Sequence, residues 1–157
     1  ILFVFLGNIC RSPTVEGVAR QLAARGAAHL QLTFDSAGTA DYHIGKAPDA
    51  RSQKAAAARG YNIAGLRARQ LEAEDFRRFD LLLAMDEDNL RDMQALAPEG
   101  LQHRAQLFLK FAPELPGPSV PDPYCGGAAG FETVLDMAEH GVRALFVAID
   151  AGLAGRG

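Results

Sequence analysis

Hydrophobic residues along this chain alternate between short continuous runs and longer helix-like segments. The runs at residues 1–6 and 80–85 are apolar over most of their length, which is typical of strands buried on both faces of a parallel sheet. Helical spacing, helix-forming composition and end signals predict helices between these runs and after them. The expected helices span residues 12–26, 49–59, 86–97 and 131–149.

Two further strands carry weaker signals. Residues 30–34 alternate apolar and polar side chains, which predicts a more exposed strand, and residues 36–48 have the composition of a loop. Residues 105–111 give a fourth candidate strand. The five prolines between positions 113 and 123 predict a long rigid loop. The acidic side chains at 72–75 are expected on a solvated helix face.

The order of these elements indicates one fold class. Strands and helices alternate until the long loop and the last helix, and such alternation implies parallel strands with helices on both faces of the sheet. We therefore expect an α/β fold with three α-β-α layers, a four-stranded parallel sheet and one domain over residues 1–157. Ligands of such sheets bind beyond the carboxyl ends of the strands.

Composition narrows the class of protein. At 157 residues, with 48% hydrophobic and 22% charged residues, the chain fits one globular domain. Its formal net charge of -3 gives no reason to expect a nucleic-acid or membrane partner. Cys10 and Cys125 are too few for a disulfide framework, so we expect a cytoplasmic protein. The four histidines lack metal-ligand spacing, so we expect neither a metal nor another cofactor.

The loop after the first strand has the features of an oxyanion site. It comprises Leu6, Gly7, Asn8, Ile9, Cys10, Arg11 and Ser12. Because the loop leads into a helix N-terminus, unpaired backbone N–H groups and the helix dipole can surround an anion there. Gly7 permits close backbone approach, and the planar guanidinium of Arg11 suits two phosphate oxygens. The alternative is a structural turn with a surface arginine.

Four segments, in order along the chain, resemble motifs of the low molecular weight protein tyrosine phosphatases. They are Phe3–Pro13, Asp35–Thr39, Ala84–Leu90 and Asp122–Glu132. The first resembles the family signature of a cysteine, five residues, an arginine and a serine, except that Phe5 stands where the family has the cysteine. The resemblance covers essentially the whole chain and implies the phosphotyrosine protein phosphatase I-like fold.

The resemblance also implies a mechanism. In the family, a cysteine thiolate attacks phosphorus to form a cysteinyl-phosphate, which water then hydrolyses. That role falls on position 5, where Phe5 has no nucleophilic atom. Arg11 would bind the phosphoryl oxygens and stabilise the transition state, and Asp122 would protonate the leaving phenolate oxygen. The implied activity is hydrolysis of phosphotyrosine and aryl phosphate monoesters, and we expect the chain as written to be inactive.

Other residues would support the phosphate site or line its entrance. Asn8 and Ser12 would hold the loop through side-chain hydrogen bonds. The substrate rim and its support would consist of Ser36, Tyr42, His43 and Tyr124. The implied partner is a phosphotyrosine protein or a small aryl phosphate, with inorganic phosphate or sulfate as the site anion. We expect the chain to be a monomer or a weak dimer.

Phe5 leaves alternative hypotheses open. A phosphatase active in its native form would carry Phe5 as an engineered or erroneous change, whereas a natural pseudophosphatase would bind phosphate or a phosphoprotein without turnover. An arsenate reductase or a protein arginine phosphatase on the same fold is a third possibility. The chain lacks the cysteine relay of the first, and Ile9 replaces the smaller threonine of the second. Cys10 as a substitute nucleophile would lose in-line geometry.

Overall fold

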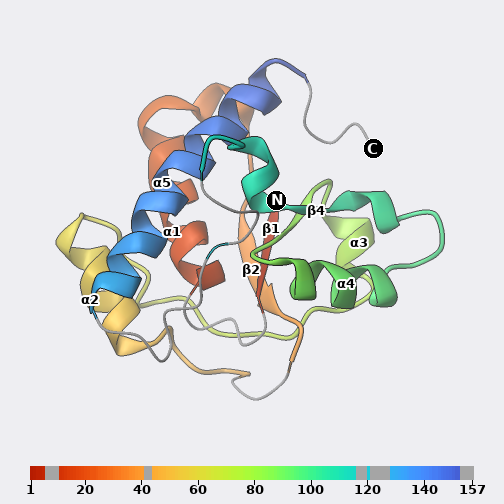
Figure 1. Ribbon diagram of the computed structural model, residues 1–157, viewed down its shortest axis with the longest axis horizontal. Helices are drawn as coiled ribbons and strands as arrows, with labels where there is room; N and C mark the ends of the chain where they lie inside the picture. The colour runs from red at the N-terminus through yellow and green to blue at the C-terminus, as the bar shows by residue number, and fades with distance from the viewer. Residues whose placement is uncertain (6–10, 41–43, 116–119, 121–127, 153–157) are drawn as a thin grey trace.

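A four-stranded parallel sheet with helices on both faces forms the framework of the protein (Figure 1). The computed structural model describes residues 1–5, 11–40, 44–115, 120 and 128–152. The strands are β1 (Leu2–Phe5), β2 (Asp35–Gly38), β3 (Leu82–Ala84) and β4 (Ala105–Leu107), in the spatial order β2-β1-β3-β4. The α-helices are α1 (Arg11–Gly26), α2 (Ala50–Ala58), α3 (Asp75–Arg78), α4 (Glu87–Leu96) and α5 (Ala128–Asp150), and the 3-10 helices are η1 (Ala28–Leu30), η2 (Gln102–Arg104) and η3 (Phe108–Phe111). The expected α/β fold class is confirmed.

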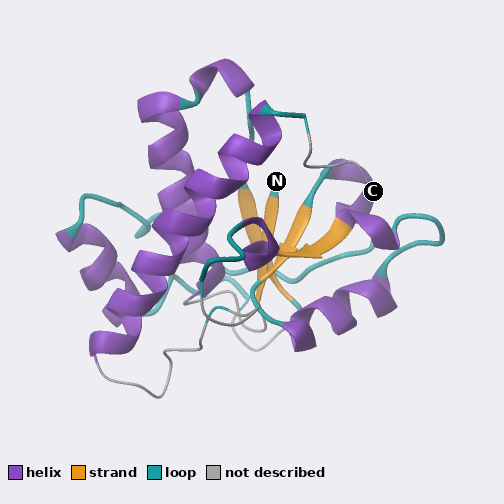
Figure 2. Ribbon diagram, turned by 45° about the horizontal axis from the view of Figure 1, so that its top comes forward, coloured by secondary structure: helices purple, strands orange, loops and turns teal. Residues whose placement is uncertain are grey.

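The central strand β1 divides the hydrophobic core between the two faces of the sheet. Phe3 and Phe5 belong to the cluster that includes α1 and α5, whereas Leu2 and Val4 belong to the cluster that includes α3 and α4. Figure 1 shows α1, α2 and α5 on one side of the sheet and α3 and α4 on the other, and Figure 2 shows the strands between these layers. Because both faces of β1 are covered, its sequence is a continuous apolar run without polar alternation.

The switch point of the sheet, where the direction of strand addition reverses, lies between β1 and β3. From β1 the chain crosses through α1 to β2 on one side, and it later returns to β3 on the other side of β1. Arg11 opens the helix that follows β1, and Asp86 caps the helix that follows β3. In open α/β sheets, ligands bind in the crevice beyond such a switch point, so the topology brings these two charged residues to the expected place.

The second strand lies later in the chain than the alternating pattern predicted. The expected strand over residues 30–34 is wrong, because Leu30 ends η1 and Gln31 adopts a positive φ of 53°, which extended backbone does not allow. The strand is instead Asp35–Gly38, most of which was predicted as a loop. Ser36, Ala37 and Gly38 are buried, whereas Asp35 is partly exposed. A short strand buried on both faces has no alternation from which it can be read.

The expectation of a solvated face at 72–75 holds for Glu72 and Glu74, which are exposed, but it is wrong for Asp75. The side chain of Asp75 is fully buried, and its carboxylate accepts two hydrogen bonds of 3.0 Å from Arg69 and one of 2.8 Å from the backbone N–H of Glu72. A buried carboxylate requires such partners. Asp75 therefore fastens the short helix α3 to the preceding segment.

The C-terminal helix α5 has the apolar stripe that the sequence predicted. Val134, Ala138, Val142 and Leu145 are buried on this stripe, which packs against α1. In the part of the chain that the structure describes, no helix has the combination of length and apolar character that crossing a bilayer requires.

Gly141 provides a test of how tightly α5 packs over η3. A Cβ atom at this position would lie 2.5 Å from Cζ and 2.8 Å from Cε2 of Phe108, whose side chain is fully buried. Alanine is favoured over glycine within a helix by about 0.5–1 kcal/mol, but overpacking costs about 1–3 kcal/mol. We therefore expect Gly141→Ala to lower the free energy of unfolding by about 1–2 kcal/mol, measured by urea titration.

The matched control is Gly26→Ala at the end of α1, where nothing lies within 4 Å of the added Cβ. This variant should keep the parent stability or gain up to about 1 kcal/mol. Equal free energies of unfolding for the two alanine variants would show that the Phe108 ring does not restrain α5.

Candidate functional site

Arg11 is the charged group at the centre of the candidate site. It opens α1, yet its side chain is only 3% exposed. Its Nη1 lies 3.0 Å from Asp86 Oδ2 and donates a 2.6 Å hydrogen bond to the carbonyl of Val120. Val120 is itself fixed, because its N–H donates to the carbonyl of Met85 at 2.7 Å, directly after β3. The guanidinium is thus held by two segments that meet at the carboxyl end of β3.

Asp86 performs two tasks with its two carboxylate oxygens. Oδ1 accepts a 2.8 Å hydrogen bond from the backbone N–H of Asn89 and caps α4, while Oδ2 pairs with Arg11. A buried cation at a helix N-terminus is disfavoured by the helix dipole, so Arg11 needs a nearby anion. The sequence placed Asp86 in a motif without assigning it a role, although its position after the third strand could have indicated one.

Phe5 also lies against Arg11. It is the last residue of β1, and its carbonyl accepts a 2.9 Å hydrogen bond from the N–H of Thr39 beyond β2. Its ring is buried within the α1 and α5 core cluster and lies beneath the guanidinium, with 3.4 Å between Arg11 Cζ and the ring centroid. A guanidinium at this distance over an aromatic face is a cation–π contact.

A second polar group links α1 to β2 behind the site. Glu16 is 1% exposed; its Oε1 accepts a 2.6 Å hydrogen bond from Ser36 Oγ and its Oε2 a 2.8 Å bond from Arg20 Nε. Arg20 also donates to the carbonyl of Phe34 at 2.6 Å. Ser36, expected as a supporting residue, is thus bonded to a buried glutamate that the sequence did not single out. The helical spacing of Glu16 and Arg20 was the available signal.

Only part of the expected site falls among the described residues. The structure brings Phe5 and Arg11 into contact, buries Ser12 fully in the first turn of α1, and bonds Ser36 to α1. The expected residues outside the described part are Leu6, Gly7, Asn8, Ile9, Cys10, Tyr42, His43, Asp122 and Tyr124. Their roles remain predictions, as do the catalytic roles of Phe5 and Arg11. Within the described ranges, no group of three His, Cys, Asp or Glu side chains is arranged to hold a metal ion.

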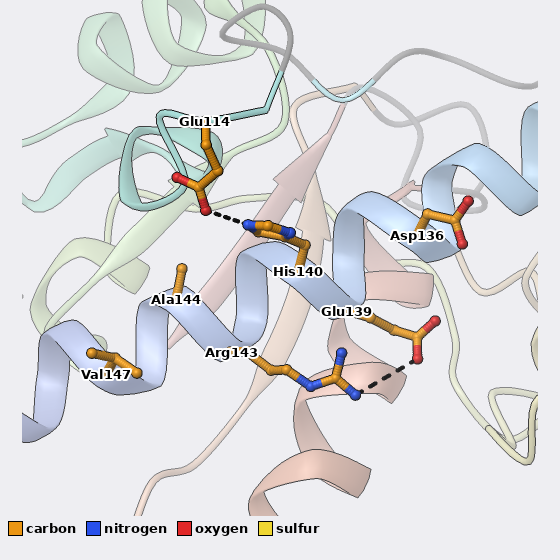
Figure 3. A pocket seen from close by; sticks show the side chains of 7 residues that line it. All are labelled: Glu114, Asp136, Glu139, His140, Arg143, Ala144 and Val147. Atoms are coloured by element: carbon orange, nitrogen blue, oxygen red, sulfur yellow. Dashed lines mark hydrogen bonds and ion pairs between the residues drawn. The ribbon is translucent and has the colours of Figure 1, made fainter.

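A separate pocket on the outer side of α5 is unrelated to Arg11. It is lined by Glu114, Asp136, Glu139, His140, Arg143, Ala144 and Val147, all but the first from α5 (Figure 3). The hydrogen bond from His140 lowers the pKa of the Glu114 carboxyl below its usual range, and Arg143 pairs with Glu139 at 4.0 Å. The pocket lacks the buried cation expected of a phosphate site.

Comparison with known sequences gives a consistent result. Residues 1–154 match the family described as low molecular weight phosphotyrosine protein phosphatase. The low molecular weight phosphotyrosine protein phosphatase of Schizosaccharomyces pombe is 39% identical over 132 residues, covering 83% of this chain and 84% of the relative. The low molecular weight protein-tyrosine-phosphatase of Streptomyces coelicolor is 39% identical over 160 residues, covering 99% and 96%.

Solved structures give the same result at the level of the backbone. A crystal structure of the protein tyrosine phosphatase from Entamoeba histolytica with Hepes in the active site is similar, with a TM-score of 0.91, 36% identity and coverage of 96% of each chain. YfkJ from Bacillus subtilis matches with a TM-score of 0.89 and 33% identity, covering 96% of this chain and 94% of its own. Vibrio vulnificus Wzb in complex with benzylphosphonate matches with a TM-score of 0.82 and 28% identity, covering 93% and 95%.

The contact between Arg11 and Asp86 can be tested through stability. Asp86→Asn keeps an oxygen that can cap α4 but removes the charge that compensates the buried guanidinium. We expect the free energy of unfolding to fall by about 1–3 kcal/mol in urea titration, because a buried charged group loses its partner.

Asp88→Asn is the matched control, since it removes the same charge from the first turn of the same helix. In the described part of the chain, Asp88 is exposed and forms its ion pair with the equally exposed Arg91, so the loss should be about 0.5 kcal/mol or less. Equal losses in the two variants would contradict a structural role for the Arg11–Asp86 pair.

Proposed function

Because the chain belongs to the low molecular weight phosphotyrosine protein phosphatase family, we propose that its site is built to hydrolyse phosphotyrosine and other aryl phosphate monoesters. The observation that carries this proposal is the buried guanidinium of Arg11 at the start of α1, beyond the carboxyl end of β1. A permanently charged planar fork at a helix N-terminus is suited to a tetrahedral dianion.

The reaction assigns a role to each residue of the proposed site. A thiolate at position 5 attacks phosphorus while the aryl oxygen departs, and Asp122 donates a proton to that oxygen. Water then attacks the cysteinyl-phosphate, which releases inorganic phosphate and regenerates the thiolate. Arg11 stabilises the negative charge on the transferring phosphoryl group in both steps. Tyr42 and Tyr124 are proposed to form the walls of the pocket that holds the aryl group.

Phe5 removes this chemistry from the chain as written. A phenyl ring offers neither a lone pair for attack on phosphorus nor a group that ionises, so no cysteinyl-phosphate can form. The fold does not depend on a thiol at this position, since β1 pairs along its length with β2 and with β3. We therefore propose a complete phosphatase framework without its nucleophile.

Two ligands of related structures support the proposed substrate class. The Vibrio vulnificus protein was solved with benzylphosphonate, whose tetrahedral phosphonate is attached to an aromatic ring through one carbon. The Entamoeba histolytica enzyme holds Hepes in its active site, and Hepes ends in a tetrahedral sulfonate. Both molecules combine a tetrahedral oxyanion with a larger organic group, as an aryl phosphate does.

Restoring the thiol tests the proposal. We expect Phe5→Cys to hydrolyse para-nitrophenyl phosphate with an optimum on the acid side of neutrality, because Asp122 must be protonated for the first step. In that background, Asp122→Asn should lower turnover of phenyl phosphate by about 100-fold or more. Initial rates at saturating substrate provide the measurement.

Phe5→Ser is the control, because serine is similar in size to cysteine but cannot supply a thiolate. This variant should remain inactive. A folded Phe5→Cys protein that shows no hydrolysis above the Phe5→Ser background, with Arg11 and Asp122 intact, would refute the proposed function.

A further inference from the structure

The guanidinium of Arg11 lies directly against the face of the Phe5 ring. The distance of 3.4 Å from Arg11 Cζ to the ring centroid is a direct van der Waals contact, so no atom of a ligand can lie between the two groups. The guanidinium is held on another side as well, since Nη1 contacts both Asp86 Oδ2 and the carbonyl of Val120. The face of the guanidinium that Phe5 covers and the Nη1 group that Asp86 and Val120 engage are therefore not available to an anion.

The ring cannot easily leave this position. Phe5 lies opposite Gly38 in the pairing of β1 with β2, and its carbonyl is bonded to the N–H of Thr39. Its side chain is 6% exposed and belongs to the core cluster that joins the sheet to α1 and α5. Moving the ring aside would expose apolar surface to water or require the core to rearrange, and both are unfavourable.

From this geometry we propose that Phe5 is a built-in occupant of the Arg11 site, which closes the chain as written to phosphate and other tetrahedral oxyanions. The inference rests on the proposed function, because it takes Arg11 as the phosphate-binding group. It goes further by assigning Phe5 a second effect, independent of the missing thiol: the loss of binding as well as of chemistry.

The inference makes separate predictions for phosphate binding and for turnover. A chain that lacked only the thiol would still bind phosphate and would function as a phosphate-binding pseudophosphatase. A chain whose Arg11 is covered by Phe5 binds no phosphate, and a small residue at position 5 restores binding without restoring turnover. Phe5→Ser therefore isolates the effect of the ring.

The experiment is isothermal titration calorimetry with inorganic phosphate against the chain as given, Phe5→Ser and Phe5→Cys. We expect phosphate to bind both variants at least tenfold more tightly than the chain as given. Arg11→Met in the Phe5→Ser background should remove the gained affinity, which locates the binding at Arg11. A phosphate-dependent rise in Tm, seen in the two small-residue variants only, gives an independent readout of binding to the folded state.

The possible outcomes are distinct. Equal phosphate affinity of the chain as given and Phe5→Ser would overturn the inference and favour a phosphate-binding pseudophosphatase. A failure of both folded variants to bind phosphate would also overturn it, because the ring would not be what closes the site. Phosphate binding by Phe5→Cys without hydrolysis of para-nitrophenyl phosphate would refute the proposed function while supporting the role of the Phe5 ring.

Discussion

The structure around the candidate site depends on one ion pair, between the buried Arg11 and the partly buried Asp86. The helix dipole of α1 and the low exposure of the side chain both disfavour a cation at this position. Asp86 compensates for both effects, and it does so from the cap of a different helix. The pair therefore joins the first turns of α1 and α4 across the carboxyl ends of β1 and β3. The carbonyl of Val120 adds a third segment to the same guanidinium.

This arrangement explains why the framework tolerates Phe5. The strand β1 owes its stability to hydrogen bonding with two neighbours and to burial on both faces. An apolar ring at its end extends the core cluster toward Arg11, where it finds a cation–π partner. Phe5 therefore fits the fold at the end of β1, while under the proposed function it lacks the atom that the chemistry needs.

Much of the fold was predictable from the sequence, because its signals were local. The apolar run of β1, the approximate ranges of α2 and α4, and the stripe of α5 are read directly from residue order. Strand β2 was not predictable from alternation, since its last three residues are small and all of them are buried. The burial of Asp75 was also missed. It depends on the pairing with Arg69, which the sequence pattern did not indicate.

The sequence indicated where a candidate site would lie, but it did not indicate the contacts that the structure shows there. A helix start after a buried strand, together with Arg11, indicated an anion site from sequence alone. The stacking of Phe5 on Arg11 depends on the alternation of side chains along β1, which directs the odd-numbered residues toward α1 and α5. The pairing with Asp86 depends on strand order, which no local pattern specifies. Contacts between segments distant in sequence require the topology first.

The most direct test of this account is a double-mutant cycle between Arg11 and Asp86, followed by urea unfolding of the four proteins. The account predicts strong coupling: Arg11→Met combined with Asp86→Asn should be more stable than Asp86→Asn alone, by about 1 kcal/mol or more, because the unpaired buried charge is gone. Losses that add to within about 0.5 kcal/mol would show that the two residues act independently, which would contradict the account.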